Sequence, residues 1–145
     1  MKKTKVGDWM TRNPIVIDAR ANVLEAMHLL KEKNIRRVPV LRDGKLVGIL
    51  TERMLLTCSP GSSSSLDAWE ANYLLARTQV TEVMNPTPNT VTPDVELADA
   101  AKLIHDRKLN GITVVDEKGD LVGILTTTNA LEALIYFAEE ARRAK

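Results

Sequence analysis

Leu46-Val47-Gly48-Ile49-Leu50-Thr51 is a six-residue string that recurs as Leu121-Val122-Gly123-Ile124-Leu125-Thr126. Upstream of the string, the second copy aligns with the first at an offset of 74 residues, as in Val6 with Val80, Met10 with Met84, Pro14 with Pro88 and Val40 with Val114. At the string itself the offset is 75, so the second copy has one added residue, within positions 117–120. An added residue is best accommodated in a loop. The repeat predicts two similar units that bury their apolar faces against each other, and we expect function where they meet.

Composition excludes several classes of protein. A length of 145 residues suffices for one compact domain or for two small halves that share a core. A net charge of +1 gives no basic stripe for nucleic acid. The single Cys58 cannot form an intrachain disulfide, which favours a reducing compartment, and we expect the cytoplasm. The basic residues at 2–5 precede no apolar segment and no run is long enough to span a membrane, so a soluble, untargeted protein is expected.

Each copy has the pattern strand, helix, strand, strand, helix. Asn22-Val23-Leu24-Glu25 has the form of a capping box and predicts a helix that extends to about Lys33. Strand-like runs at 38–41 and 45–50 flank Asp43-Gly44, a strong hairpin signal, and a short helix is expected from Thr51. The second copy predicts strands at 90–91, 112–115 and 121–125, a helix at about 95–108 and a last helix at about 127–143. The expected fold class is α/β (α+β).

The linear organisation predicts three parts. Residues 1–57 form the first unit, 58–79 a Ser-rich linker with an inserted helix, and 80–145 the second unit with the C-terminal helix. The stretch 58–65 contains Pro, Gly and four consecutive serines, and is expected to be a mobile surface loop. The inserted helix has Trp69 and Tyr73 on one side, and we interpret them as packing residues rather than as a ligand platform.

The repeated motifs resemble those of the cystathionine beta-synthase-type (CBS) domain pair. They are the segments 10–14 and 84–88, the strand entry Arg36-Arg37-Val38-Pro39-Val40, and Gly-Ile-Leu-Thr at 48–51 and 123–126. The resemblance covers nearly the whole chain except the linker, the inserted helix and the tail. With its insert, the stand-alone pair also resembles bacterial acetoin-utilisation regulators. This resemblance implies tandem β-α-β-β-α units packed pseudo-symmetrically through their sheets, two clefts that take adenosine-containing ligands, and a homodimer.

Helix starts supply the candidate ligand contacts. A helix beginning near Thr126 offers backbone N–H groups, a positive dipole end and a hydroxyl, which suit a phosphate. Asn129 lies one turn on and could hydrogen-bond a ribose. The resemblance implies adenine between 87–90 and 111–113, with Arg36 and Arg37 as anion partners from the other unit. The predicted site comprises Thr126, Asn129, Thr87, Pro88, Asn89, Thr90, Gly111, Ile112, Thr113, Arg36 and Arg37.

The first cleft is predicted to be the weaker site, because Met54 stands where the second copy has Asn129 and offers no useful hydrogen bond to a ribose. Its candidate residues are Asn13, Pro14, Val16, Val38, Pro39, Thr51 and Met54. A simpler interpretation applies to both copies: Thr51 and Thr126 are ordinary N-caps, Asn129 is an exposed helix residue, and the arginines are surface charge.

Catalytic motifs are absent from the sequence. There is no Gly-rich phosphate loop with its Lys, no metal-spaced His and no nucleophile beside a base, so we expect neither an enzyme nor a required cofactor or metal. The leading hypothesis is a regulatory, energy-sensing module that binds AMP, ADP, ATP or S-adenosylmethionine and acts on an unidentified protein. The alternatives are a ligand-free dimerisation or protein-interaction module and, third, a nucleic-acid-associated regulator, which near-neutral charge and 3% aromatic content disfavour.

Overall fold

The computed structural model describes residues 2–58 and 67–144, and the chain divides into two compact units. Residues 15–88 form one of them, called here the central unit. Residues 1–14 and 89–145 form the other, called the terminal unit because it contains both ends of the sequence. Each unit is described separately below.

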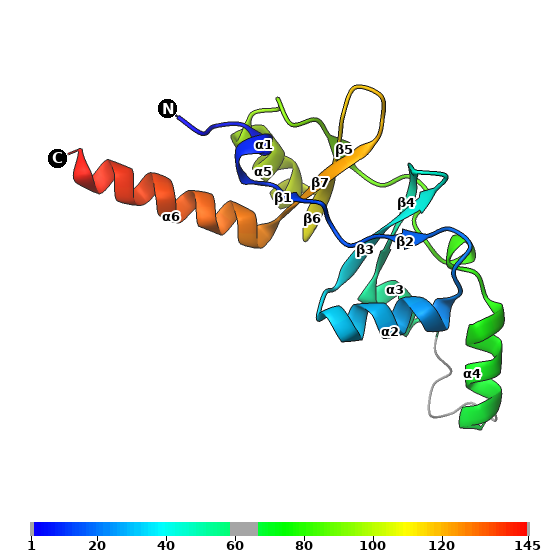
Figure 1. Ribbon diagram of the computed structural model, residues 1–145. Coiled ribbons are helices and arrows are strands. Elements are labelled where there is room, and N and C mark those ends of the chain that lie inside the picture. Colours follow the sequence, from blue (N-terminus) through cyan, green and yellow to red (C-terminus); the bar gives the residue numbers. More distant parts are fainter. Residues whose placement is uncertain (1, 59–66, 145) are drawn as a thin grey trace. The chain divides into compact units, whose positions relative to one another are not determined.

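The central unit is a three-stranded sheet with helices (Figure 1). β2 (Ile17–Asp18) pairs in parallel with β3 (Arg37–Arg42), which pairs antiparallel with β4 (Lys45–Thr51). Helices α2 (Val23–Lys33) and α3 (Glu52–Leu56) lie together on one face of the sheet, and α4 (Ala68–Arg77) packs against α2. A short 3-10 helix, η1 (Val80–Glu82), follows α4. The predicted order strand, helix, strand, strand, helix is confirmed.

Helix α2 begins as the sequence predicts. The Asn22 side chain accepts from the Glu25 N–H at 2.8 Å, and the Glu25 carboxylate accepts from the Asn22 N–H at 3.0 Å. These two bonds satisfy groups that a helix start otherwise leaves unpaired. The helix ends at Asn34, whose left-handed conformation (φ 52°) stops the chain from continuing as a helix. Its inner face is buried in the core of the central unit.

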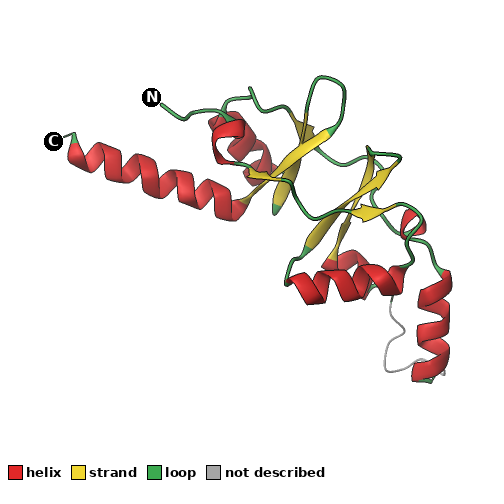
Figure 2. Cartoon of the chain, viewed as in Figure 1, coloured by secondary structure: helices red, strands yellow, loops and turns green. Residues whose placement is uncertain are grey.

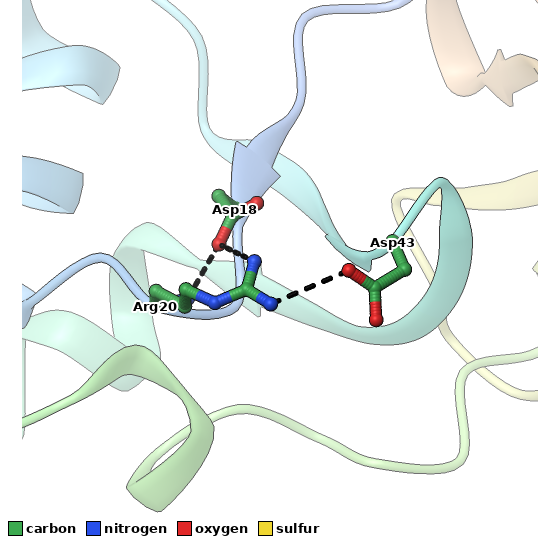
Figure 3. A network of polar contacts seen from close by, with 3 residues as sticks. All are labelled: Asp18, Arg20 and Asp43. Carbon is green, nitrogen blue, oxygen red and sulfur yellow. Dashed lines mark hydrogen bonds and ion pairs between the residues drawn. The ribbon is translucent and has the colours of Figure 1, made fainter.

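The hairpin turn between β3 and β4 is the two-residue turn predicted from Asp43-Gly44, with both residues at positive φ (50° and 83°). Arg20 ties this turn to the end of β2, as Figure 3 shows. Its guanidinium lies 3.3 Å from Asp43 Oδ1 and 3.5 Å from Asp18 Oδ1. The hydrogen bond to Asp43 and the charges of both carboxylates raise the pKa of Arg20. All three groups are well exposed, so the network orders the turn more than it stabilises the fold.

The terminal unit repeats the plan with one extra strand (Figure 2). Its sheet has the order β1 (Thr11–Arg12), β7 (Leu121–Thr126), β6 (Gly111–Val115) and β5 (Thr90–Val91), and only the β5–β6 pair is parallel. Its helices are α1 (Val6–Trp9), α5 (Leu97–Asp106) and α6 (Thr127–Arg143). α1 packs against α6, where the Trp9 ring lies 5.4 Å from that of Tyr136. The predicted mixed α/β class is confirmed.

The added residue of the second copy lies in the turn between β6 and β7, as predicted. This turn is closed by a bond from the Asp116 N–H to the Asp120 carbonyl (2.9 Å), with Gly119 at φ 83°. Both hairpins have a register shift at the same place, between Val40 and Leu41 and between Val114 and Val115. The two hairpins therefore share the same register shift and differ in the length of the turn.

The segment that leads into each repeat packs on the other repeat, which the sequence analysis did not predict. The Val6 N–H bonds the Val95 carbonyl (2.9 Å), and the Val80 N–H bonds the equivalent Ala21 carbonyl (2.9 Å). A methionine in each leading segment occupies the space over a glycine: Met10 lies over Gly123 and Met84 over Gly48. The spatial units 15–88 and 1–14 with 89–145 therefore differ from the linear parts 1–57, 58–79 and 80–145.

Each unit has its own apolar core, built from alternate strand residues and one helix face. The central core includes Ile17, Ala19, Val23, Ala26, Leu30, Val38, Val40, Leu50, Leu55, Leu75 and Val80. The terminal core includes Val6, Met10, Leu97, Ala100, Ile104, Ile112, Val114, Leu125 and Ala133.

Two expectations about the insert have different outcomes. The predicted loop at 58–65 lies, apart from Cys58, outside the described residues. In α4, only Leu75 is buried, and the rings of Trp69 and Tyr73 stack on each other at the surface. The two rings therefore contact each other and do not contribute to the core of the central unit. α4 therefore has apolar residues on two sides. Leu75 faces the core, whereas Trp69, Tyr73 and Leu74 face solvent.

Candidate ligand-binding site

The start of α6 is held by two side chains that bond each other's backbone. Thr126 is the N-cap, and its Oγ1 accepts from the Asn129 N–H at 3.2 Å. The Asn129 Oδ1 accepts in return from the Thr126 N–H at 2.9 Å and from the Thr126 hydroxyl at 3.1 Å. Asn129 is only 7% exposed. The N-cap interpretation of Thr126 is thus correct, whereas Asn129 is not an exposed helix residue.

The other end of the Asn129 amide makes longer contacts. Nδ2 lies 3.4 Å from Thr11 Oγ1 in β1 and 3.3 Å from Glu132 Oε1 one turn further along α6. Both distances exceed the usual N–H···O range, so these bonds are weaker than those at Oδ1. A ligand hydroxyl could replace an Nδ2 contact at small cost, whereas replacing an Oδ1 contact would disrupt the helix start. Asn129 is therefore better suited to donate to a ligand than to accept from it.

The remaining predicted residues of the terminal unit gather at one end of its sheet. Gly111, at the start of β6, is the register partner of Thr126, at the end of β7. Asn89 precedes β5 at the same end, and its carbonyl accepts from the Thr113 N–H (3.3 Å) and hydroxyl (2.7 Å). Ile112 and Thr113 are buried, and Thr90 pairs with Thr113. The fold thus places the starts of β5 and β6 beside the start of α6.

Arg107 is a residue at this end of the sheet that the sequence analysis missed. It follows α5, and its guanidinium donates to Asn89 Oδ1 at 2.6 Å. No local signal distinguishes this arginine from the other exposed charges of α5, because the contact joins residues that are far apart in the sequence. It is a cation beside a residue of the predicted site.

The equivalent place in the central unit has the same backbone and different side chains. Thr51 Oγ1 accepts from the Met54 N–H at 3.2 Å, as Thr126 does from Asn129, but the thioether returns no such bond. The Glu52 N–H bonds the Arg36 carbonyl at 2.8 Å, just as the Thr127 N–H bonds the Asn110 carbonyl at 3.1 Å. The register partner of Thr51 is Arg37, where the terminal unit has Gly111.

Arg37 is a half-buried cation at this end of the central sheet. Burial lowers the pKa of its guanidinium, because the charged form loses water. Among the described residues, no carboxylate forms an ion pair with Arg37. A partly desolvated guanidinium without a counter-charge is suited to receive an anion.

The predicted sites are divided between the two units. The terminal unit contains Thr126, Asn129, Asn89, Thr90, Gly111, Ile112 and Thr113 of the stronger site, with Asn13 and Pro14 of the weaker one. The central unit contains Thr87, Pro88, Arg36, Arg37, Val16, Val38, Pro39, Thr51 and Met54. Of these, Val38 and Pro39 are buried in β3, whereas Thr87 is exposed and bonded to the Asn85 side chain through its N–H (3.0 Å) and hydroxyl (3.2 Å).

Two absences concern residues 2–58 and 67–144. No three His, Cys, Asp or Glu side chains there are grouped so that they could hold a metal ion. Within the same residues, no helix is both long and apolar enough to cross a membrane.

Comparison with known proteins gives one consistent relationship. The family model described as the CBS domain matches residues 6–61 and 80–136. The chloroplastic CBS domain-containing protein CBSX2 of Arabidopsis thaliana is 31% identical over 159 aligned residues, which cover 96% of this chain and 67% of CBSX2. The resemblance inferred from the repeated motifs is confirmed.

Solved structures agree with this relationship. The crystal structure of CBSX2 in complex with AMP has a TM-score of 0.78 and 33% identity, covering 93% of this chain and 98% of that one. The acetoin utilization protein AcuB from Vibrio cholerae has a TM-score of 0.78 and 30% identity, with 97% of each chain covered. The cytosolic domain of the Mg2+ channel MgtE, solved with ATP, has a TM-score of 0.71 and 28% identity over 90% of this chain and 48% of that one.

Proposed function

Because the chain belongs to the CBS domain family, we propose that it is a regulatory module that binds an adenosine-containing ligand in its terminal unit. The AMP complex of CBSX2 and the ATP complex of MgtE support this class of ligand. AMP, ADP, ATP and S-adenosylmethionine are the candidates, and the module needs no cofactor and performs no catalysis. Occupancy of the site changes the affinity of the chain for a regulated protein.

One observation carries the proposal: Asn89, Gly111, Thr126 and Asn129 converge at one end of the terminal sheet. In this proposal the extended backbone near Asn89 and Gly111 contacts the adenine edge through peptide groups other than the Asn89 carbonyl, which is already bonded to Thr113. Asn129 Nδ2 donates to a ribose hydroxyl in place of its long contact with Thr11. The phosphate lies at the start of α6, a 17-residue helix whose dipole favours an anion at that end.

Side chains near this helix start favour a ligand of low charge. The first residues, Thr126, Thr127 and Thr128, are neutral, and Arg107 is already bonded to Asn89. A nucleoside monophosphate therefore fits the terminal unit better than a triphosphate does. Arg36 and Arg37 are kept as candidate anion partners, Arg37 on the ground of its desolvated guanidinium.

Ligand binding is proposed for the terminal unit alone. Met54 gives a ribose only a weakly accepting sulfur, and Glu52 adds a negative charge to the first turn of α3. An unpaired ribose hydroxyl costs about 1–3 kcal/mol, or roughly ten- to a hundred-fold in affinity. The expected stoichiometry is therefore one nucleotide per chain.

Calorimetric titration tests the proposal. Wild-type protein is titrated with adenosine, AMP, ADP, ATP, S-adenosylmethionine, NAD and cyclic dinucleotides, with GMP as the control for the base. We expect one site per chain and preference for an adenine compound. Thermal unfolding gives a second measurement. A ligand at 100 times its dissociation constant adds about 2.7 kcal/mol to the free energy of unfolding, which raises the melting temperature by roughly 5–10 °C. Equal binding of GMP and AMP, or two equivalent sites, would contradict the proposal.

We also propose that the chain forms a homodimer through α6. Leu131, Leu134 and Ile135 lie on one side of this helix and are 58–62% exposed. A groove of about 640 Å³ beside them is lined by apolar residues of α5 and α6, and also by the charged residues Lys2, Glu96 and Asp99. A second copy would cover this apolar stripe. Light scattering should report a dimer at micromolar concentration, and Leu134→Glu should give a folded monomer. A dimer with no affinity for any ligand in the panel would instead favour the ligand-free interaction module.

A further inference from the structure

Helix α4 of the central unit presents an ordered row of side chains to solvent. Trp69, Tyr73 and Arg77 are spaced four residues apart, so they follow one another along a single face. The Trp69 side chain is 74% exposed and that of Tyr73 is 49% exposed. Their rings are stacked, with centroids 5.9 Å apart and an interplanar angle of 10°. A tryptophan this exposed is unusual in a monomeric surface.

Arg77 completes the row. Its Nη1 donates to the Tyr73 hydroxyl at 2.9 Å, and its guanidinium carbon lies 5.3 Å from the Tyr73 ring centroid. The opposite side of α4 holds Leu75, which is buried in the core of the central unit. One face of α4 is thus packed in the core through Leu75. The other face exposes the indole of Trp69, the phenol of Tyr73 and the guanidinium of Arg77, which contact one another in that order.

The charges of α4 are also ordered along the helix, with acidic residues at its start and a basic residue at its end. Asp67 and Glu70 lie at its start, and Arg77 is the last residue of the helix. An antiparallel copy of α4, related by a twofold axis near Tyr73, would bring Arg77 of each copy to Trp69 and Glu70 of the other. Arginine against indole is a favourable cation–π pair, and arginine against glutamate is an ion pair. The row is therefore complementary to itself in the antiparallel direction and repels itself in the parallel one.

We propose that α4 is a contact surface for a second copy of this chain, which pairs with it in the antiparallel direction. This surface belongs to the central unit and is distinct from the apolar stripe of α6 in the terminal unit. A ten-residue helix is smaller than the roughly 800 Å² per partner that a stable interface needs. The contact is weak alone and acts at high local concentration, joining chains or dimers into larger assemblies.

Charge exchange between two variants tests the pairing directly. Glu70→Arg places two arginines against each other in the antiparallel pair, and Arg77→Glu places two glutamates against each other. Each variant alone is expected to self-associate at least about tenfold more weakly than the wild type. Sedimentation velocity over about 10 µM to 1 mM measures the association.

An equal mixture of the two variants is expected to regain association. In a mixed pair, the arginine introduced at position 70 of one chain faces the glutamate introduced at position 77 of the other. At the opposite end of the same pair, the unaltered Arg77 of the first chain faces the unaltered Glu70 of the second. Both contacts join opposite charges, so the mixture restores the complementarity that each variant alone has lost.

Matched controls separate this contact from general effects. Glu117→Arg and Lys118→Glu lie in the β6–β7 turn and change the net charge by the same amounts as the α4 variants, so they should neither weaken association nor gain from mixing. All samples share an unaltered α6, and circular dichroism checks that α4 stays helical. Absence of any concentration-dependent step in the wild type, unchanged association of either single variant, or failure of the mixture to recover would each overturn the proposal.

Discussion

The starts of α3 and α6 show how one backbone plan gives two different sites. In both, a threonine caps the helix and accepts from the N–H three residues on at 3.2 Å. In the terminal unit, Asn129 returns a bond to the threonine N–H, whereas in the central unit Met54 returns none. The geometry of the helix start is thus set by the threonine, and its chemistry by the residue one turn later.

The residue across the strand from each threonine differs as well. Arg37 faces Thr51 in the central unit, and Gly111 faces Thr126 in the terminal unit. Across the strand from the threonine, the central unit has a half-buried cation and the terminal unit has a glycine, while the amide of Asn129 has no counterpart at Met54. The two units therefore share the backbone arrangement of this helix start and differ in the side chains around it.

The largest effect is expected where the two units are alike. A Cβ added at Gly48 would collide with Met84 Sδ and lie 2.9 Å from the Asn85 carbonyl, and one added at Gly123 would lie 2.7 Å from Met10 Sδ and 2.8 Å from the Thr11 carbonyl. The methionines can move, but the carbonyls belong to paired backbone. Gly48→Ala and Gly123→Ala should each lower the free energy of unfolding by about 1–3 kcal/mol in urea denaturation.

Gly7→Ala is the control for these variants, since its nearest neighbour would be Pro93 Cβ at 3.1 Å and the loss should be much smaller. If only one of the two strand glycines proved sensitive, the packing of leading segments would not be equivalent in the two units.

This exchange of leading segments marks the limit of what the repeat could predict. The capping box at Asn22, the Asp43-Gly44 hairpin and the extent of α6 depend on neighbouring residues and were predicted correctly. The partner of Met10 depends on packing between distant segments. Because Gly48 and Gly123 occupy equivalent positions in identical strings, nothing in the strings themselves favours one partner over the other.

The second effect concerns ligand binding and the difference between Asn129 and Met54. Asn129→Ala should weaken nucleotide binding about tenfold or more, because it removes both the Nδ2 donor and the support of the helix start. Met54→Ala should change binding little. Asn129→Asp keeps an acceptor for the Thr126 N–H and separates these two roles. Calorimetric titration gives the affinities, and a larger loss from Met54→Ala than from Asn129→Ala would reverse the assignment of the site.

The geometry of the candidate site was only partly predictable from the sequence. Thr126 and Asn129 were identified from spacing, since residues three apart in a helix share a face. The direction of the Asn129 amide was not, because it depends on Thr11 in a strand from the other end of the chain. The contact of Arg107 with Asn89 depends equally on the closure of the sheet.

A smaller difference is expected between the two helix caps. Loss of a threonine N-cap costs about 1 kcal/mol, and in the terminal unit the bond from the Thr126 hydroxyl to Asn129 Oδ1 is lost as well. Thr126→Val should therefore lower the melting temperature more than Thr51→Val does. Thr126→Val should also weaken phosphorylated ligands more than adenosine, whereas Thr51→Val should affect neither. Equal effects of the two variants on ligand affinity would show that the α6 start does not hold the phosphate.

The smallest expected effect is a pH dependence of stability. It concerns Asp94, which occupies in the second copy the position that Arg20 has in the first. The hydrogen bond from the Thr92 hydroxyl lowers the pKa of Asp94. The Asp94 carboxylate therefore contributes to the stability of the fold above its ordinary pKa of about 3.9, and this contribution to stability is lost as the pH falls through the lowered pKa. Arg20 stays charged throughout this range. NMR titration of Thr92→Val should show the pKa of Asp94 moved up towards its ordinary value. An unaltered Asp94 titration would contradict the role of Thr92.

Because residues 1–14 complete the terminal unit, the continuous central unit is enclosed within the sequence of the other. During synthesis, the ribosome releases every residue of the central unit before β6 and β7 exist, so this unit is able to fold first. Met10 and Thr11 are synthesised early, but the residues that they contact, Gly123 and Asn129, are synthesised much later. The terminal unit can therefore be completed only after the central unit has been synthesised.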